Sequence, residues 1–313
     1  MLTQTKSPQI NTTIILLISG VCASIFMVWV TAYAIGTSPD SLIYLDTAEN
    51  ILVGNGVYTR GEPMTHYPPG YPLILTLVGL LQRDNIIQSA RFLHIILFGC
   101  NVFLVGFTTK LCTNDNLLAI GIAILGFLTS FAVISSHAMV WSDPPFITLL
   151  LTAFILLTWH VINPKWVLIW GLTGLTSFAI ILRFIGVTFI PAVILTILLF
   201  DSRTLHKKLK DIVIFVMISS LPLIIWLGRN IAVAQTVADR ESSFQFLGFH
   251  LDLHILFSRF YEFVLPLPMP TWFKALQFVI VIFAITLGIL VLYKKKYIQH
   301  NRQLSQVVLP ATY

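Results

Sequence analysis

Residues 40–72 read DSLIYLDTAENILVGNGVYTRGEPMTHYPPGYP, and this polar interval decides how the rest of the chain is interpreted. It is the longest polar stretch in an otherwise apolar sequence, and it directly follows the first membrane-length apolar run. It holds four of the thirteen acidic residues, namely Asp40, Asp46, Glu49 and Glu62. Because these carboxylates stand beside rigid Pro and Gly residues in one early loop, we expect a functional site here, at the membrane surface.

The composition sets the fold class. Of the 313 residues, 57% are hydrophobic and 10% are charged, and the mean hydropathy is +0.87. A soluble domain carries roughly a quarter charged residues, so a soluble protein is excluded. We expect an all-α, polytopic transmembrane helical bundle. The formal net charge of +6 then reflects orientation and contact with anionic lipids rather than nucleic-acid binding.

Runs of apolar residues predict about eight membrane spans, because a helix that crosses the hydrocarbon core needs about 20 apolar residues. The expected spans are Ile14–Ile35, Ile86–Leu111, Leu117–Ser135, Phe146–Ile162, Trp166–Leu182, Phe184–Phe200, Ile212–Gly228 and Phe273–Tyr293. Only Arg183 separates the fifth and sixth, which indicates a tight hairpin or a re-entrant join. Tyr71–Leu81 is apolar but too short to span, so we interpret it as a half-buried or interfacial helix.

The lysines predict the orientation. With the N-terminus cytoplasmic, Lys274 is the one lysine that falls on the outer side, as the positive-inside rule favours. Residues 1–293 then form a transmembrane domain whose outer loop, 36–85, carries the expected site. Residues 294–313 form a basic cytoplasmic tail.

The outer loop is expected to begin as a helix. Ser38 can cap its start, and Gly54 and Gly56 can end it. One face of this helix carries residues four apart: Asp40, Tyr44, Ala48 and Leu52. Asp40, in the first turn, has two readings that the spacing leaves open, a helix-capping residue and a carboxylate of the expected site.

Two further segments have both a structural and a functional reading. Tyr67-Pro68-Pro69-Gly70-Tyr71-Pro72 forms a rigid corner, since proline fixes φ and restrains the residue before it. The corner can also shape a groove for a lipid or a sugar. Asp143, in Ser142-Asp143-Pro144-Pro145, caps a span or faces Asp40 across the bundle.

Arg183 and Arg229 stand at the outer ends of spans. A guanidinium there snorkels, pairs with an outer carboxylate, or binds a phosphate headgroup in a bidentate manner. His66, His137, His250 and His254 are expected on the outer side, but their spacing matches no metal motif, and we predict no metal site. A divalent metal stays an open alternative. Cys22, Cys100 and Cys112 are interpreted as core thiols.

Taken in order, these residues resemble the GT-C glycosyltransferases. The nearest branch is the bacterial group of protein mannosyltransferase-like and aminoarabinose-transferase-like enzymes. The likeness extends from about Asp40 to Asn230 and rests on these segments: Asp40-x-x-x-Tyr44-x-x-x-Ala48, Gly54-x-Gly56, Tyr67-Pro68-Pro69-Gly70-Tyr71-Pro72, Ser142-Asp143, Arg183-x-x-Gly186 and Trp226-x-x-Arg229-Asn230. The chain has fewer spans than members of that family usually have.

The resemblance implies a bacterial-type plasma membrane enzyme whose active face is extracytoplasmic. Such enzymes transfer a sugar, with inversion, from a polyprenyl-phosphate donor to a lipid, glycan or protein acceptor. By this likeness Asp40 is the general base, Asp143 orients the acceptor, and Arg183 and Arg229 hold the donor phosphate. The implied substrate groove comprises Tyr44, His66, Tyr67, Pro68, Pro69, Gly70 and Tyr71. The alternative is a non-catalytic homologue, a transporter or a lipid-binding scaffold with the same fold.

Overall fold

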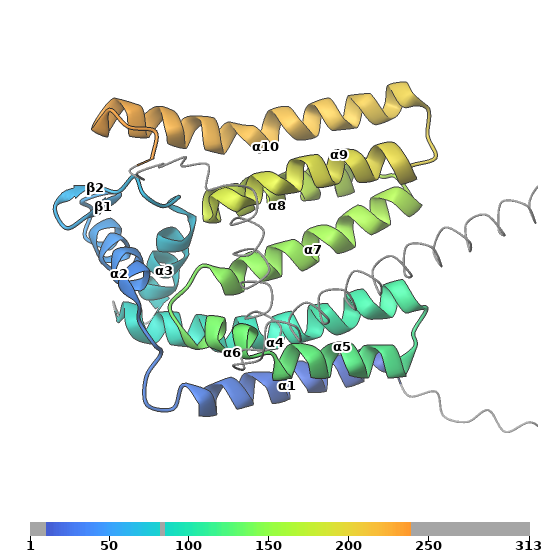
Figure 1. Ribbon diagram of the computed structural model, residues 1–313, viewed down its shortest axis with the longest axis horizontal. Helices are drawn as coiled ribbons and strands as arrows, with labels where there is room; N and C mark the ends of the chain where they lie inside the picture. Colours follow the sequence, from blue (N-terminus) through green and yellow to red (C-terminus); the bar gives the residue numbers. More distant parts are fainter. Residues whose placement is uncertain (1–10, 82–84, 239–313) are drawn as a thin grey trace, which may run out of the picture. The chain divides into compact units, whose positions relative to one another are not determined.

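The computed structural model describes residues 11–81 and 85–238, which belong to one compact unit (Figure 1). The expected all-α class is confirmed for these residues, apart from one small antiparallel pair of strands. In chain order the elements are α1 (Thr12–Val30), α2 (Pro39–Leu52), β1 (Tyr58–Thr59), β2 (Glu62–Pro63), α3 (Gly70–Leu81), α4 (Ile86–Thr113), α5 (Leu117–Thr129), α6 (Phe131–Ala138), α7 (Asp143–Ile162), α8 (Trp166–Leu182), the 3₁₀ helix η1 (Phe184–Thr188), α9 (Phe189–Phe200) and α10 (Leu205–Ala234).

Several of these helices mark a membrane-embedded protein. By length and composition, α1, α4, α7 and α10 can each cross a membrane, and α5 with α6 makes a fifth span if the bent pair counts as one. Two other expected spans are shorter apolar helices, α8 and the η1–α9 pair. The expected span Phe273–Tyr293 and the tail 294–313 lie outside the described residues. The described residues therefore support four or five spans.

The third expected span is bent rather than straight. The axes of α5 and α6 differ by 56°, with the break at Ser130. Ser130 has extended backbone angles, and its hydroxyl accepts a hydrogen bond from the Val133 N–H at 3.5 Å. A serine in this conformation caps the start of a helix, so a second helix, α6, begins here within the same apolar run.

The first loop begins as expected. Ser38 caps α2 through a reciprocal pair of hydrogen bonds with Ser41, and Pro39 occupies the first turn. These features fix the start of the helix, because they satisfy orphan N–H groups and preset φ. Gly54 and Gly56 follow the helix with φ of +87° and +85°, values that glycine adopts without strain.

A small hairpin that the sequence analysis did not predict follows α2. Strands β1 and β2 are joined by Arg60 and Gly61, both with positive φ, as tight hairpin turns favour. The Asp46 carboxylate accepts hydrogen bonds from the Arg60 N–H at 2.7 Å and the Thr59 hydroxyl at 2.8 Å. Asp46 therefore attaches the hairpin to α2.

Helix α4 connects the first loop to the rest of the bundle, since it packs against α1, α3, α5, α6 and α7. Its closest neighbour is α1, where Gly20 faces Gly99. A Cβ at Gly99 would lie 2.5 Å from the Gly20 carbonyl oxygen, so only small residues permit this approach. The Ser24 hydroxyl donates across the same contact to the Ile95 carbonyl at 3.1 Å.

The join at Arg183 is a tight hairpin, one of the two forms expected. Arg183 is extended, with φ of −150° and ψ of 136°, and it separates α8 from η1. The chain then folds back, and Gly186 packs directly on the backbone of Ala179. Residues of α8 and α9 share one apolar core cluster.

The seventh expected span is confirmed by length and composition, whereas the expectation for the cysteines was wrong. Helix α10 is longer than Ile212–Gly228, because its polar ends continue the helix beyond the apolar segment and Pro222 is accommodated inside it. The three cysteines are free thiols on exposed positions rather than core residues. Apolar helices in lipid have an apolar exterior, so a small thiol in an apolar run need not face the protein core.

Candidate functional site

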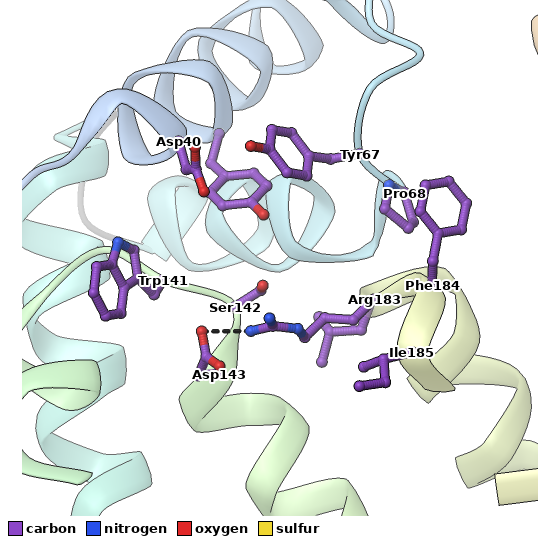
Figure 2. A pocket seen from close by; sticks show the side chains of 11 residues that line it. Asp40, Tyr67, Pro68, Trp141, Ser142, Asp143, Arg183, Phe184 and Ile185 are labelled. Carbon is purple, nitrogen blue, oxygen red and sulfur yellow. Dashed lines mark ion pairs between the residues drawn. The ribbon is translucent and has the colours of Figure 1, made fainter. Parts of the chain in front are cut away.

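A cavity of about 360 Å³ lies where the first loop meets the start of α7 and the hairpin after α8 (Figure 2). We call it the Asp40–Arg183 cavity. Its lining residues are Asp40, Tyr44, Tyr67, Pro68, Trp141, Ser142, Asp143, Leu182, Arg183, Phe184 and Ile185. The fold thus brings together three charged residues that are far apart in sequence, Asp40, Asp143 and Arg183.

Asp40 is held at the rim by the start of α2. Its side chain is exposed, and it lies in the first helical turn behind the Ser38 cap. The Trp141 indole N–H donates to the Ser38 hydroxyl at 2.8 Å, and the Ser41 hydroxyl donates to the Val140 carbonyl at 2.9 Å. These bonds attach the start of α2 to the segment that leads into α7.

Asp143 and Arg183 form an ion pair across the cavity, drawn as the dashed line in Figure 2. Asp143 opens α7, and Arg183 lies in the extended hinge between α8 and η1. The Arg183 guanidinium also lies 5.9 Å from the centre of the Phe146 ring. Both side chains keep about a third or more of their surface exposed, 40% for Asp143 and 33% for Arg183, so a ligand can reach them.

Three tyrosines cluster on one side of the cavity, where Tyr44 and Tyr67 line it and Tyr71 packs behind them. The Tyr44 ring centre lies 4.9 Å from that of Tyr67 and 5.0 Å, edge to face, from that of Tyr71. Burial raises the pKa of the Tyr44 phenol above its ordinary value, against the opposing effects of its hydrogen bond with Ser142 and the Arg183 charge. Tyr44 therefore keeps its proton at neutral pH and presents a hydroxyl beside the charged residues.

Arg229, predicted to hold the donor phosphate, does not line this cavity. Its Nη1 donates to the Met64 carbonyl at 2.7 Å, and its Nη2 donates to the Val57 carbonyl at 2.9 Å. Its guanidinium also lies 4.9 Å from the centre of the Trp226 ring. These contacts attach the hairpin loop to α10.

The predicted groove is divided between the cavity and the core. Tyr44, Tyr67 and Pro68 line the cavity, whereas His66, Pro69, Gly70 and Tyr71 do not. The His66 ring packs edge to face on Tyr67 at 4.5 Å. Gly70 packs on the backbone of Ile181 and Leu182, and Tyr71 is fully buried. The YPPGYP corner is therefore mainly a packing element behind the cavity wall.

Sequence reasoning missed four lining residues, namely Trp141, Leu182, Phe184 and Ile185. Trp141 is next to Ser142, Leu182 and Phe184 are next to Arg183, and Ile185 is two residues after Arg183. The signal that could have found them is this adjacency, because a short loop that positions one side chain also exposes its neighbours.

The histidines offer no metal centre in the part of the chain that the structure describes, where no three His, Cys, Asp or Glu side chains gather. His137 was expected to face outward, and it is instead fully buried in the bundle. It faces Asn101 because α6 turns inward after the Ser130 bend. His250 and His254 lie outside the described residues.

Comparisons with known proteins identify no relative of this chain. No protein-family model matches the chain, and neither a curated protein nor a solved structure matches it. The resemblance to GT-C enzymes therefore stays a prediction, and it rests on the residues quoted above.

Proposed function

We propose that this chain is an integral membrane glycosyltransferase. It transfers a sugar from a polyprenyl-phosphate donor to a lipid, glycan or protein acceptor at the extracytoplasmic face, with inversion at the anomeric carbon. The observation that carries the proposal is that Asp40, Asp143 and Arg183 line one cavity. Such a site needs a carboxylate to accept a proton and a cation for a phosphate leaving group.

In the proposed reaction, Asp40 accepts the proton of the acceptor hydroxyl as its oxygen attacks the anomeric carbon. The bond between that carbon and the donor phosphate oxygen breaks, and the electron pair leaves on the polyprenyl phosphate. Asp40 is exposed at the rim, where an acceptor can approach it. A general base in this role typically contributes about 10²–10⁴ to the rate.

Arg183 is the proposed phosphate ligand. Among the described residues it forms one ion pair, with Asp143, and its side chain is 33% exposed, so an anion can approach the guanidinium. A guanidinium can hold two phosphate oxygens at once, which suits a leaving group that gains negative charge. Asp143 then has two tasks, which are to orient Arg183 and to contact the acceptor.

The proposed orientation follows from the two ends of α7. Asp143 begins this helix at the cavity, and His160 lies near its other end beside Arg203. At 1.5 Å per residue, a helix of 20 residues is about 30 Å long, the thickness of a hydrocarbon core. Lys207, Lys208 and Lys210 follow Arg203, so the positive-inside rule assigns the cavity to the outer face.

The test combines cells and purified protein. Deletion of the gene should cause one polyprenyl-phosphate sugar to accumulate in lipid extracts, and that sugar names the donor. In proteoliposomes with this donor, Asp40→Asn should lower transfer at least about 100-fold. Asn caps a helix nearly as well as Asp, so the variant should fold normally.

The matched control is Glu49→Gln, an exposed carboxylate on the same helix. It should keep the wild-type rate. Full turnover by Asp40→Asn would remove this residue from the mechanism. Donor binding without transfer in the wild type would favour the lipid-binding scaffold instead.

A further inference from the structure

Behind the cavity, a chain of polar side chains crosses the interior of the bundle. Tyr71, His94, Asn101 and His137 are each 0% exposed. Together with Thr148 we call them the buried ladder. Polar groups inside a membrane bundle are costly unless each one is paired, so a continuous set of them indicates a specific task.

The hydrogen bonds of the His94 ring allow one assignment of its proton. His94 Nδ1 lies 3.1 Å from the His137 carbonyl oxygen, which only accepts, so Nδ1 carries the hydrogen. In a neutral ring Nε2 is then an acceptor, and it accepts a hydrogen bond from the Tyr71 hydroxyl at 2.7 Å.

The same reasoning assigns the proton of the His137 ring. His137 Nδ1 donates to the Val133 carbonyl at 2.7 Å, so its Nε2 accepts from the Asn101 amide at 3.0 Å. The same amide donates to the Pro144 carbonyl at 3.1 Å, and the Asn101 oxygen accepts from Thr148 at 2.7 Å. Every donor thus meets an acceptor when both histidines are neutral.

The ladder ends at both walls of the Asp40–Arg183 cavity. At one end the Tyr71 ring contacts Tyr44, which lines the cavity. At the other end the ladder holds the Pro144 carbonyl, in the residue after Asp143. His94 and Asn101 are two turns apart on one face of α4, about 10 Å along its axis. One helix therefore holds both walls.

We propose that His94 and Asn101 are positioning residues of the Asp40–Arg183 cavity. They do not line it. They fix the tyrosine wall and the first turn of α7 at one separation, and with them the side chains of Tyr44 and Asp143. The proposal concerns the geometry of the cavity, and only its activity readout rests on the proposed function.

The primary experiment measures opening of the α7 wall without any substrate. The three native cysteines are replaced by serine, and Ser142→Cys serves as the reporter, because Ser142 lines the cavity and is only 3% exposed. The full-length protein in nanodiscs is labelled with a hydrophilic maleimide. Asn101→Leu removes both amide donors and should speed labelling about tenfold, the ratio expected from loss of a buried hydrogen bond.

The matched control is Thr173→Val in α8. Like Asn101→Leu, it removes a buried polar group. The Thr173 hydroxyl bonds within its own helix at 2.8 Å, and Thr173 does not line the cavity. Its labelling rate should equal that of the parent. Equal acceleration by Thr173→Val and Asn101→Leu would reduce the ladder to general stability and overturn the proposal.

A second pair of variants gives a rescue test that does not depend on Asn101→Leu folding. His94→Leu removes both hydrogen bonds of the ring, whereas His94→Gln offers an acceptor to Tyr71 and a donor to the His137 carbonyl. Labelling should be fast in His94→Leu and close to the parent rate in His94→Gln. Parent-like labelling in His94→Leu would refute the positioning role.

Transfer is measured separately, in proteins with Ser142 intact. His94→Leu should lower kcat about tenfold and leave the donor KM within about twofold, because His94 bonds Tyr71 and His137, whereas the donor phosphate ligand Arg183 lies in the hinge between α8 and η1. If no transfer is found even in the wild type, the proposed function fails, and the labelling result still decides the role of the ladder.

Discussion

Gly70→Ala tests the close contact between the YPPGYP corner and the end of α8, next to the Arg183 hinge. A Cβ at Gly70 would lie 2.8 Å from the Ile181 carbonyl oxygen and 2.9 Å from the Leu182 Cα. These are backbone atoms, so no rotation of a side chain relieves the contact. Ordinary van der Waals separation is about 3.5 Å, so α3 must move by roughly 0.7 Å.

Overpacking of this kind costs about 1–3 kcal/mol, which exceeds the gain of about 1 kcal/mol at most that alanine gives in a helix. Gly70→Ala should therefore melt several degrees below the wild type in detergent, at about 2–4 °C per kcal/mol for a domain of 150–250 residues. The matched control is Gly174→Ala in α8, where a Cβ meets no atom within 4 Å. It should melt at or above the wild-type temperature.

Both variants are compared at one scan rate, because membrane proteins often unfold irreversibly. We also expect Gly70→Ala to lower the transfer rate more than its loss of stability explains, since the displaced corner carries Tyr67 and Pro68 of the cavity wall. If Gly70→Ala has the same melting temperature as Gly174→Ala and keeps full activity, the close contact between α3 and α8 does not shape the site.

Three further predictions concern charge and orientation. Arg183→Lys keeps the charge but loses the bidentate fork, so donor use in proteoliposomes should fall about tenfold, and unchanged kinetics would exclude a phosphate role. Burial raises the pKa of the Asp201 carboxyl, but hydrogen bonds from Arg203 outweigh it and hold the pKa below its usual range. Stability from this carboxylate should therefore be present at neutral pH and lost as the pH falls below about 4, where the melting curves of wild type and Asp201→Asn should converge. In intact cells, Asn55→Cys should react with a membrane-impermeant thiol reagent and Thr204→Cys should not, and the reverse pattern would invert the orientation.

The first loop was predictable because its determinants are local. Ser38 and Pro39 act within one helical turn, and Gly54 and Gly56 need positive φ whatever surrounds them. The spacing of four residues also identified the face that carries Tyr44, which is buried toward the core, while Asp40 stays exposed at the rim. Local rules of this kind need no knowledge of the distant chain.

The task of Arg229 was not predictable, because its partners are far away in sequence. It bonds carbonyls that are 165 and 172 residues distant, and no pattern around it encodes them. The ladder was partly accessible, since His94 and Asn101 are seven residues apart and so share a helix face. Its other members depend on the bend at Ser130, which turns His137 inward.

The charges of the cavity define what donor binding still requires. Two carboxylates, Asp40 and Asp143, face one guanidinium, Arg183, so the lining residues have one more negative than positive formal charge. An anionic polyprenyl phosphate would meet net repulsion there unless a further cation joins it. The sequence offers Arg240 and Arg259 beyond the described residues, and a divalent metal brought with the donor would serve equally.

These two sources of positive charge predict different results. If a metal supplies it, chelation should abolish transfer, and Mg²⁺ or Mn²⁺ should restore it, while Arg240→Gln and Arg259→Gln stay active. If an arginine supplies it, one of these variants should lose donor use while chelation has no effect. Full transfer in both arginine variants and under chelation would mean that the cavity accepts the phosphate with Arg183 alone. Since Asp143 already pairs with Arg183, that result would require the remaining N–H groups of the guanidinium to hold the phosphate against the net negative charge of the cavity.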